Sequence, residues 1–160
     1  GAPLALAWSP DGKFLAHGNQ DATVHFWVAA TGVELQMAGY PTKIRELSWD
    51  YTGRFLATGG GEAVCVWDCG GKGPEGTKPQ TLDGHTEPVT AVGWQRRGFL
   101  VASAAADGRV FLWQPANKKS ARVGQDRFSD APASALAWSQ DDARLAVGAG
   151  SGEVRVYKVG

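Results

Sequence analysis

The sequence predicts an all-β protein in which one supersecondary unit is repeated four times. Its seven tryptophans fall into two columns of a single pattern. Members of the first column lie 41 to 45 residues apart, and a second aromatic follows each of them after 18 or 19 residues. The first column holds Trp8, Trp49, Trp94 and Trp138, and the second holds Trp27, Trp67, Trp113 and Tyr157. A bulky aromatic that returns at a fixed period and offset indicates a repeat architecture.

Each unit begins with a short apolar run that ends on a first-column tryptophan and enters a tight turn. The runs cover residues 4–8, 47–49, 89–94 and 133–138, and the turns cover 9–12, 50–53, 95–98 and 139–142. A turn such as Ser-Pro-Asp-Gly directly after an apolar run is typical of a strand that enters a hairpin. We therefore expect each run to be the first strand of its unit.

The remaining strands follow in chain order within each unit. We expect second strands at 14–18, 55–59, 99–104 and 144–148, and third strands that end on the second aromatic column. Fourth strands are expected at 33–37, 78–82 and 121–125, which leaves the fourth unit without one. No segment of about 10 residues shows the 3.6-residue apolar period of a helix, so no helix is expected.

Apolar residues occupy both sides of the first and third strands. Residues 4–8 read Leu-Ala-Leu-Ala-Trp, and residues 64–67 read Val-Cys-Val-Trp. Both faces of each antiparallel sheet are therefore expected to be buried, which is the arrangement of blades stacked in a β-propeller. The chain is expected to form one partial propeller, with blades at about 3–39, 40–84, 85–128 and 129–160.

The third unit carries the most informative set of polar residues. A Gly-His pair ends at His85, nine residues before Trp94, and is followed by a strand serine, a turn aspartate and a closing tryptophan. In this pattern the sequence resembles the WD-repeat β-propellers related to the G-protein β subunit, and the resemblance covers the whole chain. It implies a structural hydrogen-bond network that links turn, loop and strands, formed by His85, Ser103, Asp107 and Trp113.

The other units depart from this pattern. Tyr40 stands in place of the histidine in unit two, and Ser129 does so in unit four. Thr58 replaces the network serine in unit two, and only Trp67 is followed by the aspartate of the Trp-Asp signature. The full set is therefore expected in the third unit alone.

The same serine, histidine and aspartate could form a hydrolase triad. A triad needs an exposed nucleophile and backbone donors for the oxyanion. Ser103 instead lies inside the apolar run 101–104, in a strand that is expected to be covered on both faces. The structural role also accounts for Trp113, which a triad does not, so we predict that the protein is not an enzyme.

Two further patterns do not make a ligand site. Residues 71–76 satisfy the Gly-x-Gly-x-x-Gly spelling of a dinucleotide loop, but a β-like segment follows instead of the helix that this loop requires. Cys65 and Cys69 are the only cysteines, and they lack the paired spacing of a zinc site. We expect a flexible loop at 71–76, no cofactor and no metal.

The charge balance argues against two classes of partner. The chain has 16 basic and 16 acidic residues and a formal net charge of zero. This balance removes the bulk electrostatic attraction to nucleic acid and to anionic membranes, and no apolar run approaches about 18 residues. We expect no nucleic-acid partner, no membrane partner and a cytoplasmic location.

The turns of a propeller open on two opposite rims, and each rim carries candidate residues for partner binding. The rim of the first-to-second and third-to-fourth turns carries a basic set, with Lys72 and Lys78 nearby: Arg96, Arg97, Lys118 and Lys119. This set suits an acidic partner or a phosphate, or is a group of solvated charges. The opposite rim carries a mixture typical of binding hot spots: Tyr40, Arg45, Glu87, Arg109 and Phe128. The two aromatics of that set could equally cover the edges of blades.

The pattern is unfinished at both ends. Unit one starts directly on its first strand, and unit four stops after its third strand. Four blades would need steps of about 90° and would leave wedge-shaped voids, whereas a seven-blade ring needs steps of about 51°. We expect the C-terminal half of a larger propeller, or a half-ring that assembles with another copy, in preference to a four-blade ring.

These expectations lead to a function in binding. Rigid blades that present loops to protein or peptide partners make a non-catalytic scaffold of WD-repeat type. The alternative is a regulatory or ligand-sensing propeller module of a larger enzyme or signalling protein.

Overall fold

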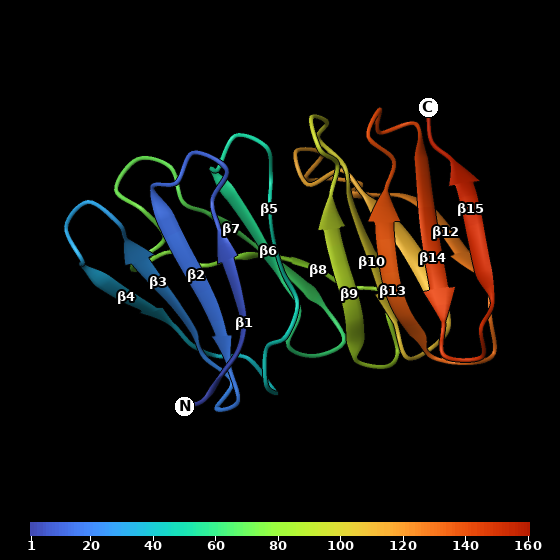
Figure 1. Cartoon of the computed structure of the whole chain (residues 1–160), viewed down its shortest axis with the longest axis horizontal. Coiled ribbons are helices and arrows are strands. Elements are labelled where there is room, and N and C mark those ends of the chain that lie inside the picture. Colours follow the sequence, from blue (N-terminus) through green and yellow to red (C-terminus); the bar gives the residue numbers. More distant parts are fainter.

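The computed structural model describes residues 1–160 and forms four antiparallel sheets, which we number as blades one to four in chain order (Figure 1). The strands of each blade are hydrogen-bonded to one another in sequence order. Blade one lies at one end of the molecule and blade four at the other (Figure 1). No helix that is long and apolar enough to cross a membrane is present. The predicted fold class is confirmed, including a last blade with three strands.

Fifteen strands make up the four blades. Blade one contains β1 (Pro3–Trp8), β2 (Phe14–Asn19), β3 (Val24–Val28) and β4 (Glu34–Met37). Blade two contains β5 (Leu47–Trp49), β6 (Phe55–Thr58), β7 (Val64–Asp68) and β8 (Gln80–Leu82). Blade three contains β9 (Val89–Trp94), β10 (Val101–Ala105), β11 (Arg109–Trp113) and β12 (Arg122–Arg127). Blade four contains β13 (Ala133–Trp138), β14 (Arg144–Ala149) and β15 (Val154–Lys158).

The hairpin turns fix the register that all four blades share. In blade one the Ser9 hydroxyl accepts a hydrogen bond from the Phe14 backbone N–H at 3.0 Å, and Gly12 adopts a positive φ of 70°. In blade four Asp142 takes the place of that glycine, with a φ of 59° that aspartate tolerates. The first-column tryptophan of each blade consequently pairs with the residue seven positions later, as Trp8 does with Leu15.

Several strand boundaries differ from the sequence expectation by one or two residues, such as the start of β8 at Gln80 instead of residue 78, and one of these differences places an aromatic side chain in a turn. The second strand of blade three was expected to begin at Phe99, but β10 begins at Val101. The shared register pairs Trp94 with Val101, so Phe99 corresponds to Lys13 of blade one and lies in the turn before the strand. Its side chain is 65% exposed.

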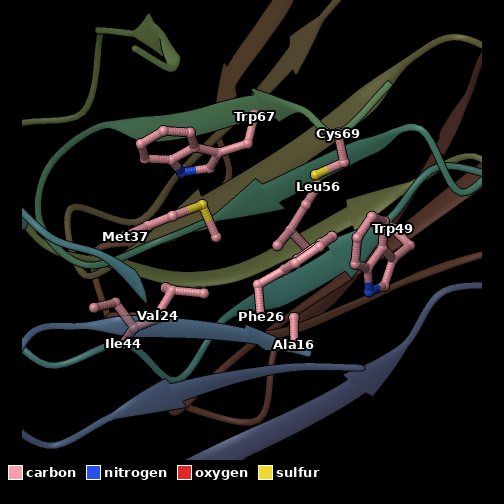
Figure 2. Close-up of a cluster of buried hydrophobic side chains, with 9 residues drawn as sticks. All are labelled: Ala16, Val24, Phe26, Met37, Ile44, Trp49, Leu56, Trp67 and Cys69. Carbon is pink, nitrogen blue, oxygen red and sulfur yellow. The ribbon is translucent and has the colours of Figure 1, made fainter. Parts of the chain in front are cut away.

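The hydrophobic core consists of three clusters, and each cluster joins two consecutive blades. In the first cluster, Ala16, Val24 and Phe26 of blade one face Leu56 and other side chains of blade two (Figure 2). The front face of each of blades one to three, which points to the following blade, is therefore buried against the back face of that blade. Because most of the core lies between sheets, no blade is a complete folding unit by itself.

The first-column tryptophans lie on these back faces. Trp49, Trp94 and Trp138 are covered by the preceding blade and are 8 to 9% exposed, whereas Trp8 has no preceding blade and is 59% exposed. The indole N–H of Trp49 donates to the Ala7 carbonyl at 3.1 Å, and that of Trp138 donates to the Gly93 carbonyl at 2.9 Å. The indole N–H of Trp94 is buried without a hydrogen-bond partner. The junction between blades two and three therefore lacks the indole hydrogen bond found at the other two junctions.

Blade four exposes the face that blades one to three bury. Val154 and Val156 occupy the positions of Val24 and Phe26 in the shared register, but they are 72% and 59% exposed. The outer edge of β15 also has no strand beside it. The two terminal faces, the back of blade one and the front of blade four, therefore occupy the same register positions as the internal faces but lack a neighbouring blade.

The indole hydrogen bond that Trp138 makes and Trp94 lacks predicts different effects of replacing these two tryptophans. We expect Trp138→Phe to lower the free energy of unfolding by about 1 kcal/mol more than Trp94→Phe. Both changes remove similar packing area, but only the first removes a hydrogen bond between blades. Urea unfolding of both variants measures the difference. Equal losses would mean that the bond from Trp138 to Gly93 contributes nothing to the stacking of blades.

Candidate functional site

The polar network of blade three lies inside the blade and connects four elements. The Trp113 indole N–H donates to the Ser103 hydroxyl at 2.8 Å, and His85 Nε2 lies 2.8 Å from the same hydroxyl. His85 Nδ1 lies 3.2 Å from Asp107 Oδ2. The structure thus brings together His85, Ser103, Asp107 and Trp113, the four residues that the sequence predicts to interact.

The hydrogen bonds of this network have a single consistent direction. Because the Ser103 hydroxyl accepts from Trp113, its own proton is available to His85 Nε2, and the histidine proton then resides on Nδ1 and is donated to Asp107. This arrangement requires a neutral imidazole. Burial lowers the pKa of His85 below its usual value despite the opposing effect of Asp107, so the folded chain favours the neutral imidazole.

Asp107 anchors the outer end of the network to the backbone. Its carboxylate accepts from the backbone N–H groups of Thr86 at 3.0 Å and Arg109 at 2.9 Å. Burial raises the pKa of the Asp107 carboxyl, but these hydrogen bonds and His85 outweigh burial and lower the pKa overall. The next residue, Gly108, has a φ of 72°, and a Cβ at that position would lie 1.9 Å from the Ser129 carbonyl oxygen. The turn that presents Asp107 therefore needs a glycine beside it.

This geometry describes a structural element and offers no accessible nucleophile. Ser103 and the His85 side chain are fully buried, and the serine hydroxyl is already hydrogen-bonded to two ring nitrogens. A substrate carbonyl cannot approach this hydroxyl without opening the blade.

Blade two builds a shorter network around Tyr40. The Trp67 indole N–H donates to the Tyr40 hydroxyl at 2.6 Å, and this hydroxyl lies 2.8 Å from the Thr58 hydroxyl. Burial raises the pKa of Tyr40. One phenol thus takes the place of the histidine of blade three and bonds directly to the tryptophan. The role of Tyr40 is internal, so its hydroxyl is not free for a partner on the rim.

Blades one and four have different polar contacts. In blade one His17 occupies the position of the network serine and stacks on His25, with ring centroids 4.9 Å apart. In blade four the Tyr157 hydroxyl donates to Asp126 of β12 at 2.7 Å, and Arg155 forms an ion pair with the same carboxylate at 2.9 Å. The tyrosine that replaces the last tryptophan therefore bonds to the preceding blade.

The candidate residues of the rim opposite the basic set differ in their exposure to solvent. Arg45 and Glu87 are exposed, and Arg109 is half-buried. Phe128 is 3% exposed and packs in the cluster between blades three and four, so it does not reach the surface. Of the two aromatics predicted on this rim, Phe128 is buried between blades three and four and Tyr40 belongs to the network of blade two.

The basic rim includes one side of a groove between blades two and three, which Lys118 lines. Arg96, Arg97, Lys118 and Lys119 are all exposed there, and Asp142 of blade four holds the backbone N–H groups of Arg96 and Arg97 at 2.7 and 2.8 Å. The groove has a volume of about 570 Å³. We name it the Val66 groove. Its lining consists of Asp50, Thr52, Arg54, Phe55, Val66, Asp68, Lys78, Gln80, Trp94, Gly98, Phe99, Pro115, Ala116 and Lys118.

Sequence reasoning found the lysines of this groove but missed its apolar residues. Phe99 was expected to begin a strand, whereas it lies in the turn before β10. Val66 and Trp94 are buried in the core cluster between blades two and three, as expected, and they also line the groove. The available signal was a comparison between units, because Phe99 stands where the other units have Lys13, Arg54 and Ala143. A large apolar residue at an exposed turn position is the exception that marks the site.

The structure shows no cluster of side chains arranged to hold a metal ion. Cys65 and Cys69 are both free, and burial raises the pKa of their thiols to about 11 and about 12. Both thiols are therefore protonated at neutral pH and act as apolar groups.

A family model described as "WD domain, G-beta repeat" matches residues 2–28, 34–68 and 76–114, which is more than half of the chain. Cell division cycle 20.4, cofactor of APC complex, from Arabidopsis thaliana, is 30% identical over 98% of this chain and 36% of its own length. Probable cytosolic iron-sulfur protein assembly protein 1 from Mycosarcoma maydis is 30% identical over 68% of this chain and 21% of its own length.

Among solved structures, a chain in the crystal structure of the mitotic checkpoint complex aligns with a TM-score of 0.82 and 25% identity. The alignment covers 96% of this chain and 46% of that chain. The chain thus spans about a third of the cell division cycle relative and about half of the aligned structure.

The network generates a prediction about stability. We expect His85→Ala and Ser103→Ala each to lower the free energy of unfolding by roughly 1 to 3 kcal/mol, because each strands buried donors or acceptors of the remaining residues. Ser134→Ala, a change of the same kind at an exposed strand position, is the matched control and should stay within about 0.5 kcal/mol of wild type. Urea unfolding measures all three. Unchanged unfolding of His85→Ala would contradict the network.

The same network predicts acid sensitivity. Because folding lowers the pKa of His85, the unfolded chain binds a proton at this residue more readily than the folded chain. The contribution of His85 to the free energy of unfolding should therefore be fully present above about pH 6.5, the pKa of histidine in the unfolded chain. It should decrease as the pH falls below this value. An NMR titration tests this directly, using the imidazole resonances that disappear in His85→Gln. A midpoint at or above about 6.5 would show that the folded chain does not favour the neutral ring.

Proposed function

Since the chain belongs to the WD-repeat family, we propose that it acts as a non-catalytic protein-interaction scaffold and that its four blades are part of a larger ring. The observation that carries the proposal is the pair of uncovered terminal faces. Each internal junction buries an apolar front face against an apolar back face, and the two terminal faces carry the same residue positions. They are therefore complementary to each other or to further blades.

Two occupants fit these faces. Further blades on the N-terminal side would cover Trp8 and could supply a fourth strand beside β15, which would close the ring. A second copy of this chain would place the front of one blade four on the back of the other blade one and give a ring of eight blades. The coverage of about half of a solved propeller chain supports the first arrangement.

We propose protein or peptide partners on the rims of this ring. The exposed candidates are Arg45 and Glu87 on one rim, with half-buried Arg109 beside them, and Arg96, Arg97, Lys118 and Lys119 on the other. The zero net charge supports partners other than nucleic acid or membrane. We infer a cytoplasmic location, which the similarity to a relative named as cytosolic supports.

Light scattering tests whether the terminal faces associate. We expect the isolated chain to show a molar mass above 16.9 kDa that rises with concentration, because two apolar faces are open. The double variant Val154→Asp with Val156→Asp should be monomeric, since a carboxylate cannot be buried between blades without a partner. Val33→Asp is the control, because Val33 is also about half-exposed but lies in the turn between β3 and β4. A monodisperse wild-type monomer would contradict assembly through these faces.

A further inference from the structure

The Val66 groove lies where blade two has a smaller side chain than blade one at the same register position, and Val66 is buried beneath it. Val66 pairs with Ala57, and Phe26 pairs with Ala16 at the same position of the shared register. At the junction of blades one and two, the Phe26 ring fills the space against Trp49, with ring centroids 5.8 Å apart. At the next junction the smaller Val66 does not fill the corresponding space beside Trp94, and this space belongs to the groove.

Phe99 adds an apolar wall that no structural requirement explains. It lies in the turn between β9 and β10 and is 65% exposed, and its ring meets that of Tyr51 edge to face at 6.1 Å. Blades one and two have Lys13 and Arg54 at this position. An exposed aromatic beside an apolar hollow is the arrangement expected of an anchor pocket for a bound side chain.

The charges around the groove leave unpaired cations and no unpaired carboxylate. The Asp50 carboxylate is buried and accepts from the backbone of its own turn, including Arg54 N–H at 3.0 Å. Asp68 forms a bidentate ion pair with the Arg54 guanidinium at 2.9 and 2.8 Å. Lys118 bonds only to the neutral side chain of Gln80, at 2.6 Å, and Lys78 has no ion pair. Two lysines therefore offer positive charge at the end of the groove formed by the β7–β8 loop and the β11–β12 turn.

We propose that the Val66 groove binds an extended peptide segment of a partner protein, with an aromatic or branched aliphatic side chain against Val66 and Phe99 and a carboxylate near Lys78 and Lys118. The proposal deepens the scaffold function and depends on it. The apolar hollow provides affinity, and the two lysines select acidic sequences over basic ones.

The experiment uses a random peptide library displayed on phage and selected against the wild-type chain. We expect the enriched peptides to combine a large apolar residue with aspartate or glutamate. Their affinities are then measured by fluorescence anisotropy with labelled synthetic copies. Val66→Phe, which installs the residue of blade one, should weaken binding by about tenfold or more, since filling an anchor pocket removes most of the binding energy. Because a phenylalanine is already accommodated at this position in blade one, the variant is expected to fold.

A charge-reversed variant and its control complete the test. Lys78→Glu with Lys118→Glu should weaken binding of the acidic peptides and reduce its dependence on salt. Lys43→Glu, an exposed lysine in the β4–β5 loop, should change neither. Enriched peptides whose binding resists both groove variants would overturn the groove while leaving the scaffold function in place. Enrichment of basic peptides, or of none, would also overturn the groove proposal, and light scattering tests the assembly of blades separately.

Discussion

Every feature of this chain depends on the requirement that each blade cover the apolar face of the next. The strands are short, and each sheet is apolar on both sides, so a blade without neighbours would leave two apolar faces in water. Stacking buries the six faces that meet at the three internal junctions, and the two terminal faces remain exposed. The exposure of Trp8 and Val154 is therefore a consequence of the same rule that buries their equivalents.

The repeat made most of the fold predictable. The spacing of tryptophans and turn residues determines where strands start and end, and a shared register follows because each hairpin turn uses the same type of contact. The four members of the blade three network were also predictable, because the third unit keeps the polar residues of the WD-repeat pattern and the resemblance implies their network. Residues whose role depends on packing between blades were not. Phe128 and Phe99 are both aromatic residues near turns, yet one is buried between blades and the other is exposed. Their difference depends on neighbours contributed by other units.

The networks show how one register position can be satisfied by different chemistry. The second-column tryptophan needs an acceptor for its indole N–H inside the blade. Blade three supplies Ser103 as part of a four-residue relay, and blade two supplies the phenol of Tyr40 directly. Both solutions pair a buried donor, which is the physical requirement, while only the first uses an ionisable pair. Divergence of the motif between repeats therefore reflects alternative ways to satisfy one buried group.

The junction between blades two and three differs from the other two junctions in two features that lie next to each other. Trp94 lacks the indole hydrogen bond found at the neighbouring junctions, and Val66 leaves open the space that Phe26 fills. A buried unpaired donor and an unfilled hollow both lower stability, and either could be removed by residues already used elsewhere in the chain. The networks of Tyr40 and His85 stabilise the two flanking blades and can offset this cost. Local departures from otherwise consistent packing are expected where a protein binds something, and here they coincide with an exposed aromatic and two unpaired lysines. Comparison of equivalent positions in the four repeats thus identifies the groove as the place where one blade does not fully cover the apolar face of its neighbour.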